Sequence, residues 1–209
     1  MDGNGRWAAQ RHLPRTAGHR SGIEAIRRIV RAAAGLGITD LTLYAFSSDN
    51  WSRPPEESTV ILGLIAEYAI TETAALVDSA TRLTFIGRRD RVPAMVRTAM
   101  LAAEVATVAG RQLRLRVAVD YSSRDSLVEA AMARPRSRED FDRLLAIPPV
   151  DLLVRTGGEQ RLSDFLLWEC AYAEFFFTPT LWPDMTAQDL AAAVTDFQRR
   201  SRRFGAVPA

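Results

Sequence analysis

Helical and strand spacings of apolar residues alternate along most of the chain, and this alternation limits the possible folds more than any other feature. Residues 21–36 repeat apolar side chains at helical spacing, and residues 41–46 form a short apolar run typical of a strand. The predicted helices are 21–36, 59–77, 92–108, 126–133, 138–146 and 187–203, and the predicted strands are 41–46, 82–87, 113–119, 150–155 and 175–181. Such alternation predicts one α/β domain over residues 1–209, with a mainly parallel central sheet flanked by helices.

Length, charge and cysteine content narrow the class of protein further. The 209 residues are 47% hydrophobic and 25% charged, a balance that suits one globular domain with a sizeable core. The net charge of +2 gives no reason to expect a nucleic-acid partner. The single cysteine, Cys170, excludes an internal disulfide and lies in an apolar run, so we expect it to be a small buried core residue.

Nothing in the sequence indicates secretion or a membrane span. No apolar run reaches the length that a bilayer-spanning helix needs, and no signal peptide precedes the first polar motif. We therefore expect a cytoplasmic protein with at most peripheral contact with a membrane.

Two polar segments come directly after predicted strands. Residues 46–54 follow the first predicted strand, and residues 155–163 follow the fourth. Because ligands bind at the carboxyl ends of parallel strands, these segments are expected at one edge of the sheet. Arg155 and Arg161 are six residues apart across a Gly-Gly turn that can fold both side chains inward, and all 27 basic residues of the chain are arginine. Arginine is the better planar clamp for phosphate, so this edge suits a phosphorylated ligand.

The first seven residues, MDGNGRW, combine an acid, two glycines and a cation in one predicted turn. Gly3 and Gly5 relieve steric limits on the backbone, so amide groups can turn toward an anion. Asp2 is a carboxylate beside flexible backbone, which suits Mg²⁺ when phosphates and waters supply the other oxygens. Arg6 can bind a phosphate through two hydrogen bonds. By itself the segment is therefore either a turn that binds phosphate and a divalent cation or an ordinary Gly-rich turn.

Read together, MDGNGRW at 1–7, FSSDNWSRP at 46–54 and RTGGEQRLS at 155–163 resemble the motifs of the cis-prenyltransferases, the undecaprenyl diphosphate synthase family. The resemblance runs from Met1 to about Gly205, with a divergent, shortened region between about residues 120 and 149. It implies a Mg²⁺-dependent homodimer that condenses an allylic diphosphate with isopentenyl diphosphate to give a cis-prenyl diphosphate.

The resemblance also has two implications for the fold. The predicted helix at 59–77 and the sheet would wall an apolar substrate tunnel. The family has an apolar strand just before the Met-Asp-Gly motif, so we expect a further N-terminal strand ahead of Met1.

Individual residues acquire implied roles from the same resemblance. Asp2 is implied to be catalytic and metal-binding, Asn50 to be catalytic, and Glu174 to be a second metal-binding acid. The residues implied to bind the allylic diphosphate are Gly3, Asn4, Gly5, Arg6, Arg15 and His19. Those implied to form a substrate lid are Ser47, Trp51, Arg53 and Glu57. Those implied to bind isopentenyl diphosphate are Arg155, Arg161 and Ser163, with Arg203 and Gly205 contributed by the tail of the neighbouring subunit.

Two of the implied roles have alternatives. Trp51 either packs within the lid or touches substrate. The proton lost after coupling is taken either by Asn50 together with Ser47 or by a diphosphate oxygen.

Two motifs depart from the family pattern. The family's Asn-Tyr-Gly-Gly-Arg is Asp-Tyr-Ser-Ser-Arg at 120–124, and its Ser-Asn-Phe is Ser-Asp-Phe at 163–165. The first change and the shortened region favour an alternative reaction, the irregular head-to-middle coupling of two allylic diphosphates to a lavandulyl-type product. The intact Asn4, Asn50 and Trp51 favour ordinary elongation.

Two more distant alternatives are a non-catalytic prenyltransferase subunit and a different α/β phosphate enzyme, such as a phosphatase. Retention of Asp2, Arg6, Arg155 and Arg161 argues against the first. The second would need an activated nucleophile, and none of the motifs positions one.

Overall fold

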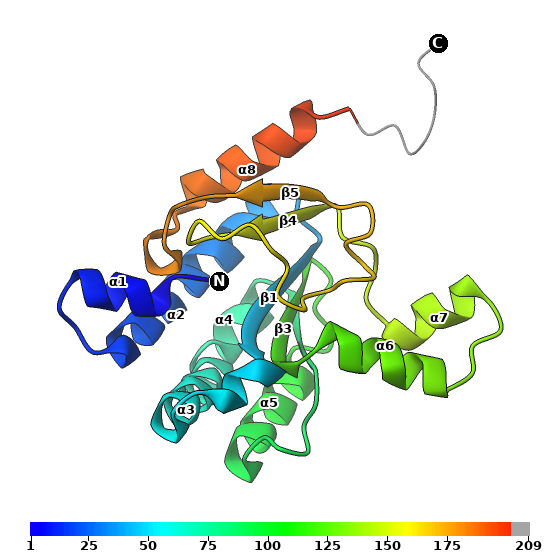
Figure 1. The fold of residues 1–209 in the computed structure, drawn as a ribbon, viewed down its shortest axis with the longest axis horizontal. Helices are drawn as coiled ribbons and strands as arrows, with labels where there is room; N and C mark the ends of the chain where they lie inside the picture. The colour runs from blue at the N-terminus through cyan, green and yellow to red at the C-terminus, as the bar shows by residue number, and fades with distance from the viewer. Residues whose placement is uncertain (202–209) are drawn as a thin grey trace.

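The strands of the protein pair in parallel, as the alternating pattern predicts (Figure 1). The structure is a computed structural model that describes residues 1–201. β1 (Asp40–Ser47), β3 (Leu113–Tyr121) and β2 (Thr81–Ile86) form a three-stranded sheet in that order. β4 (Leu152–Arg155) and β5 (Glu174–Phe177) form a second parallel group. The predicted α/β architecture is therefore confirmed, with the strands divided between two groups.

A cavity of about 860 Å³ lies between the two groups of strands. Residues 36–45, which include most of β1, line one side of it, and residues 147–156, which include β4, line the other. Among the described residues β1 pairs with β3, and β4 pairs with β5. Met1 also lines this cavity. The strand expected ahead of Met1 would precede the described residues, and that expectation stays a prediction.

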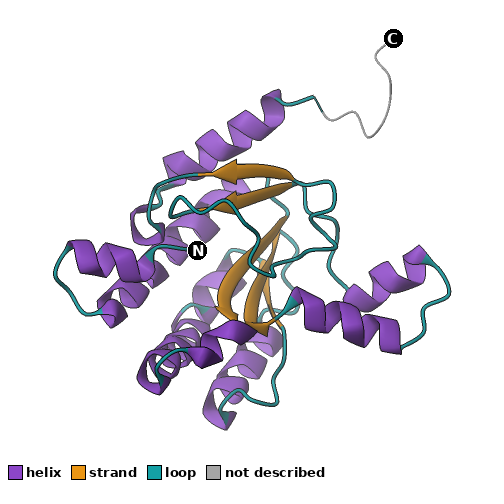
Figure 2. Cartoon of the chain, viewed as in Figure 1, coloured by secondary structure: helices purple, strands orange, loops and turns teal. Residues whose placement is uncertain are grey.

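Helices pack on the three-stranded sheet and on one another (Figure 2). α2 (Arg15–Gly35) contacts α3 (Pro55–Thr71) and α8 (Ala187–Arg199), while α5 (Ala94–Ala106) contacts α3 and β2. The main core lies between these helices and the sheet, and its buried members include Ile29, Ile65, Leu83, Met100 and Leu115. Of the helices that the structure describes, none combines the length and apolar character needed to cross a bilayer.

The predicted helix at 59–77 is wrong in one respect, because it is broken at Glu72 into α3 and α4 (Thr73–Asp78). Two side chains act at the break. The Thr73 hydroxyl donates to the Ala69 carbonyl at 2.5 Å, a local bond that bends helices. Arg27 of α2 donates to the Glu72 carboxylate at 2.7 Å, which ties the break to the neighbouring helix. Both contacts depend on packing that helical periodicity does not report.

The N-terminal segment was expected to be a turn, and the structure instead makes it a helix, α1 (Asn4–Gln10). Gly3 precedes this helix with φ 105°, a left-handed conformation that favours glycine. α1 lies against α2 at Gly18, where an added Cβ would lie 2.0 Å from the Asn4 carbonyl oxygen. The close approach of the two helices thus depends on glycine at position 18.

A smaller core connects β3, β4 and the segment at 162–173. Its buried members are Ala118, Tyr121, Leu153, Leu166 and Cys170, and Cys170 is a free thiol. The predicted buried position of Cys170 is therefore confirmed. The hairpin of α6 (Ser123–Met132) and α7 (Arg138–Leu145) lies beside it, where Trp168 donates to the Asp142 carboxylate at 2.6 Å.

Glu169 is a buried acid in this smaller core. The residue is only 5% exposed, and its Oε2 atom has no hydrogen-bond partner among residues 1–201. Burial raises the pKa of Glu169 above its usual value of 4.5, and the nearby charge of Asp142 adds to the effect. The folded protein therefore retains a proton that the unfolded chain releases. The contribution to stability is greatest below pH 4.5 and is lost as the pH rises through the folded-state pKa.

Glu169→Gln is accordingly expected to stabilise the protein at pH 7.5, by roughly 1.4 kcal/mol for each pH unit by which the fold raises the pKa, because an amide carries no charge for burial to penalise. At pH 4 the two proteins should have similar free energies of unfolding, because Glu169 is then mainly neutral in both the folded and the unfolded state. Denaturant unfolding at the two pH values measures this. Glu129→Gln, at an exposed position on α6, is the matched control and should change little at either pH. Equal effects of the two substitutions would contradict a buried, unsatisfied Glu169.

Candidate active site

The side chains of the three polar segments meet at the large cavity. Among its lining residues are Asp2, Gly3, Asn4, Gly5, Arg6, Arg15, His19, Ser47, Asn50, Arg53, Arg155, Arg161 and Ser163. Trp51, Glu57 and Glu174, which the sequence analysis also assigned to the site, do not line it. Arg203 and Gly205 lie outside the described residues.

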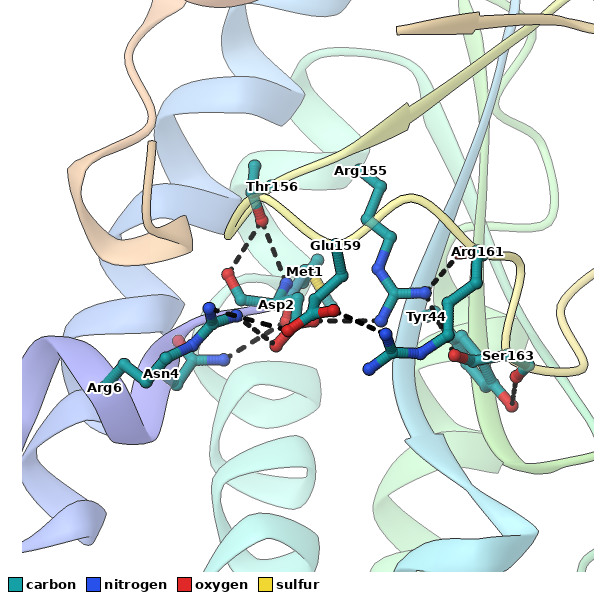
Figure 3. Close-up of polar contacts among 10 residues, drawn as sticks. All are labelled: Met1, Asp2, Asn4, Arg6, Tyr44, Arg155, Thr156, Glu159, Arg161 and Ser163. Atoms are coloured by element: carbon teal, nitrogen blue, oxygen red, sulfur yellow. Dashed lines mark hydrogen bonds and ion pairs between the residues drawn. The ribbon is translucent and has the colours of Figure 1, made fainter. Parts of the chain in front are cut away.

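Asp2 is held at the cavity by both its backbone and its side chain (Figure 3). Its amide donates to the Thr156 hydroxyl at 2.9 Å, and that hydroxyl donates to the Asp2 carbonyl at 2.8 Å. Its carboxylate accepts a hydrogen bond from Arg155 at 3.0 Å and lies 3.4 Å from Arg6. Burial raises the pKa of Asp2, but the hydrogen bond and charge of Arg155 outweigh it, so the pKa is lowered. Asp2 is therefore ionised at neutral pH.

Arg155, Arg161 and Ser163 come together at the end of β4. The Arg155 guanidinium donates to the Ser163 hydroxyl at 3.0 Å and to the Arg161 carbonyl. Glu159 accepts a hydrogen bond from Arg161 and lies 3.8 Å from the Arg6 guanidinium, so it bridges cations from two segments (Figure 3). The side chains presented here, two arginines and a hydroxyl, suit a diphosphate.

A second cluster gathers around Glu57, which is 8% exposed. Its carboxylate accepts hydrogen bonds from Arg15 at 3.1 Å and from Arg53 at 2.8 Å, and it lies 3.2 Å from His19 Nε2. Arg15 and His19 are four residues apart on α2 and so share a face. Arg53 lies two residues before α3 and reaches Glu57 in the first turn of that helix. Glu57 thus holds three basic side chains beside the cavity.

The protonation of this cluster follows from its burial and its charges. Burial raises the pKa of Glu57, but hydrogen bonds from Arg15 and His19 outweigh it and lower the pKa. Burial lowers the pKa of His19, and this effect outweighs the opposing one of Glu57. At neutral pH Glu57 is ionised and His19 is neutral, while the two arginines keep the cluster positive.

Asn50 and Trp51 lie in a 3₁₀ helix, η1 (Ser48–Ser52), that follows β1. The Asn50 side-chain oxygen accepts a hydrogen bond from the Ser47 amide at 3.1 Å. The Trp51 ring packs edge-on against Phe46, with ring centroids 5.1 Å apart. Trp51 therefore packs within the turn, and whether it also touches substrate stays a prediction. The role of Asn50 in taking a proton stays a prediction.

Glu174 is not brought to Asp2. It is the first residue of β5 and pairs with Leu152, whereas Arg155, whose guanidinium contacts Asp2, pairs with Phe177 at the other end of the strand. Its carboxylate accepts a hydrogen bond from Arg200 at 2.8 Å. Within residues 1–201 no group of three or more acidic, histidine or cysteine side chains converges on a possible metal. Asp2 lines the cavity and suits Mg²⁺ when substrate oxygens complete the coordination. The metal role of Glu174 stays a prediction.

A smaller cavity of about 70 Å³ lies between α2, α3 and the sheet. It shares Asn4 and His19 with the polar site, and its other lining residues are mainly apolar, among them Ile23, Ile26, Ile61, Leu64, Ile65 and Phe85. It occupies the position predicted for the substrate tunnel, which itself stays a prediction.

Sequence comparison decides the family. The family model described as "Putative undecaprenyl diphosphate synthase" matches residues 1–205. The chain belongs to this family. The protein is therefore a prenyltransferase of the polyprenyl diphosphate synthase type, as its motifs predicted.

Relatives of this synthase family member match it over nearly their whole length. Isoprenyl transferase 1 of Bradyrhizobium diazoefficiens is 51% identical over 217 residues, which cover 100% of this chain and 88% of the relative. Isoprenyl transferase of Brucella abortus is 45% identical over 222 residues, covering 99% and 87%. These names favour synthesis of a cis-prenyl diphosphate over the head-to-middle alternative.

Two solved structures share the fold of this synthase family member. Lavandulyl diphosphate synthase from Lavandula x intermedia, in complex with dimethylallyl diphosphate, has a TM-score of 0.95 and 32% identity, with 98% of this chain and 95% of that one covered. A probable undecaprenyl diphosphate synthase from Campylobacter jejuni has a TM-score of 0.83 and 30% identity, with 89% and 92% covered.

Two residues of the site, Thr156 and Glu159, were not predicted from the sequence. Thr156 follows Arg155 at the end of a strand and is 2% exposed, a position where a hydroxyl is expected to have a buried partner. Glu159 lies in the same Gly-rich turn as Arg161. Both residues belong to the RTGGEQRLS motif at 155–163, but only the structure shows that they contact the N-terminal segment.

Proposed function

We propose that the protein condenses an allylic diphosphate with isopentenyl diphosphate, and that each basic cluster binds one of the two. The observation that carries this proposal is the meeting of Asp2, Arg155, Arg161 and Ser163 at a cavity that also reaches Arg15, His19 and Arg53. Two separate groups of phosphate donors at one cavity suit a reaction that joins two diphosphates. The apolar pocket beside His19 suits the hydrocarbon part of the allylic substrate.

The proposed roles of the residues combine this arrangement with the family resemblance. The Gly3–Arg6 segment with Arg15 and His19 binds the allylic diphosphate and stabilises the charge that develops as its C1–O bond breaks. Arg155, Arg161 and Ser163 hold isopentenyl diphosphate, whose double bond attacks C1. The new carbon–carbon bond forms as diphosphate leaves, and loss of a proton restores a double bond in the cis geometry. Asn50 with Ser47, or a diphosphate oxygen, accepts that proton.

Mg²⁺ is the proposed cofactor, and Asp2 is the residue that would hold it. When bound, the ion supplies positive charge to the diphosphate leaving group. Arg6 and Arg155 both contact the Asp2 carboxylate and therefore orient it toward the cavity.

Incubation with Mg²⁺, isopentenyl diphosphate and a panel of allylic diphosphates tests the proposed function. We expect a product longer by one or more five-carbon units, with cis double bonds. Dimethylallyl diphosphate alone should give no product. A branched product from dimethylallyl diphosphate alone would establish the head-to-middle reaction instead, and release of phosphate without coupling would establish a phosphatase.

Arg161→Ala separates the two proposed diphosphate sites. Loss of a charged hydrogen bond is worth about 1.5–3 kcal/mol, so the KM for isopentenyl diphosphate should rise by about ten- to a hundredfold. The KM for the allylic diphosphate should change much less. Steady-state kinetics with each substrate varied in turn measures both values, and Arg138→Ala on the exposed face of α7 is the matched control. A larger rise for the allylic substrate would show that the two sites are assigned the wrong way round.

We also propose a cytoplasmic homodimer. Exposed apolar side chains occur on α6 and on the segment at 168–175, namely Val128, Met132, Trp168, Tyr172 and Phe175. Closed two-fold pairing would cover such side chains. The implied contribution of Arg203 and Gly205 to the partner's site would then make the dimer necessary for activity. Light scattering at the assay concentration tests this, and a fully active monomer would contradict it. Cell fractionation tests the location.

A further inference from the structure

Asp120, near the end of β3, is a buried carboxylate that neither basic cluster uses. The residue is 1% exposed and has φ 51°. One of its oxygens accepts hydrogen bonds from Trp51 Nε1 at 2.9 Å and from Arg91 Nη2 at 2.5 Å. The other accepts from Arg91 Nε at 2.9 Å. All these partners are distant in sequence, so the contacts are made only by the folded chain.

The geometry requires a carboxylate at this position. Burying a charge is costly unless it is paired and hydrogen-bonded, and here Arg91 supplies both. An asparagine could still accept from Trp51, but its NH₂ group would then face the Nε–H of Arg91, two donors with no acceptor between them. The aspartate at the head of the altered 120–124 motif and Arg91 therefore form one unit.

This unit is connected to the candidate site through Trp51. The indole has a single polar atom, Nε1, and that atom is bound to Asp120. The Arg91 guanidinium also lies 5.7 Å from the centre of the Trp51 ring. Trp51 stands between Asn50 and Arg53, both of which line the cavity. Fixing Trp51 against β3 thus limits where the two flanking side chains can lie.

The other hydrogen bonds of the turn are local or run to α3. Ser47 donates to Asn50 Oδ1, and the Arg53 amide donates to the Asn50 carbonyl at 3.2 Å. Ser58 of α3 donates to the same carbonyl at 3.0 Å. These bonds shape the turn and attach it to α3. The hydrogen bond from Trp51 to Asp120 instead attaches the turn to β3.

We propose that Asp120 and Arg91 are positioning residues that act through Trp51 on Asn50 and Arg53, and that they tune the allylic diphosphate site rather than the isopentenyl diphosphate site. The choice of site follows from Arg53, which shares Glu57 with Arg15 and His19. Naming the substrate rests on the proposed function, but the contact between Asp120 and Trp51 does not.

The first test is spectroscopic and needs no substrate. Asp120→Asn should shift the fluorescence emission of the protein, because it changes the partner of the Trp51 indole. The chain has four tryptophans, so the same substitution is also made in a Trp51→Phe background. There the shift should disappear. A shift that persists without Trp51, or no shift at all, would overturn the contact. This result is independent of whether the protein transfers prenyl groups.

The second test divides the effect between the substrates. Asp120→Asn is expected to raise the KM for the allylic diphosphate about tenfold, the value of one charged hydrogen bond, and to leave the KM for isopentenyl diphosphate unchanged. A change that merely destabilised the fold would not select one substrate. Equal rises in both values, or no rise, would overturn the positioning role. Absence of any prenyl transfer in the unmodified protein would instead overturn the proposed function.

Two further variants complete the design. Asp90→Asn removes a carboxylate from an exposed Arg88–Asp90 pair and should leave both KM values unchanged. Asp120→Asn with Arg91→Gln lets the asparagine NH₂ donate to the glutamine carbonyl, so the allylic KM should recover in part. The double variant also serves if Asp120→Asn alone does not fold. If the allylic KM of the double variant is no lower than that of Asp120→Asn, then Arg91 and Asp120 do not act as a unit.

Discussion

Asp2→Ala is expected to reduce turnover by about a hundredfold or more while leaving the fold intact. Removal of a carboxylate that holds a catalytic metal costs several kcal/mol of transition-state stabilisation, and each 1.36 kcal/mol is about tenfold in rate. The fold should survive because the Asp2 backbone, rather than its side chain, bonds to Thr156. The measurements are kcat at saturating Mg²⁺ and the thermal unfolding midpoint.

The matched control for Asp2 is Asp78→Ala, which removes an exposed acid on α4. It should leave kcat unchanged. A near-normal kcat for Asp2→Ala would rule out Asp2 as the metal-linked residue. Unfolding of the Asp2 variant would instead show that its pairing with Arg155 is needed for stability.

Gly18→Ala is expected to be strongly damaging for a change of one methyl group. The added Cβ would lie 2.0 Å from the Asn4 carbonyl oxygen and 3.3 Å from the Ala8 side chain, so α1 must move. Overpacking of this kind typically costs about 1–3 kcal/mol. Asn4 and Arg6 are carried on α1, and a displacement of about 1 Å at a reacting centre can cost about a hundredfold in rate. We therefore expect loss of both stability and turnover.

Gly35→Ala provides a control within the same helix, because an added Cβ there meets no atom within 4 Å. Alanine is favoured over glycine in helices by roughly 0.5–1 kcal/mol, so this variant should be as stable as the unmodified protein or slightly more so. Denaturant unfolding and kcat are measured for both variants. Similar behaviour of the two would contradict the close contact of α1 and α2.

Elements with a strong repeating pattern were predicted well. The predicted strand at 82–87 is β2 (Thr81–Ile86), and the predicted start of the last helix at 187 is the start of α8. Burial on one face imposes the spacing of apolar residues, so the spacing reports the element directly. Some other helix starts were predicted less accurately. The helix predicted to start at residue 21, for example, is α2, which begins at Arg15. Its first turn carries the polar site residues, which interrupt the apolar repeat.

The gathering of the polar segments could also be predicted, because parallel strands present their carboxyl ends at one edge. Arg155, Arg161 and Ser163 are close together as expected. Glu57 was predicted to take part in the lid, and the structure adds that it holds Arg15, His19 and Arg53 together. The identity of its partners required knowledge of how α2 and α3 pack.

The sequence by itself determined the α/β class, the approximate elements and the presence of residue types that suit phosphate, because these depend on local spacing and side-chain chemistry. Tertiary structure alone decided the pairings between distant residues. Thr156 with Asp2, Glu159 with Arg6, and Asp120 with Trp51 are separated by 154, 153 and 69 residues. No local pattern encodes such contacts, since each depends on the positions that packing gives to two different elements.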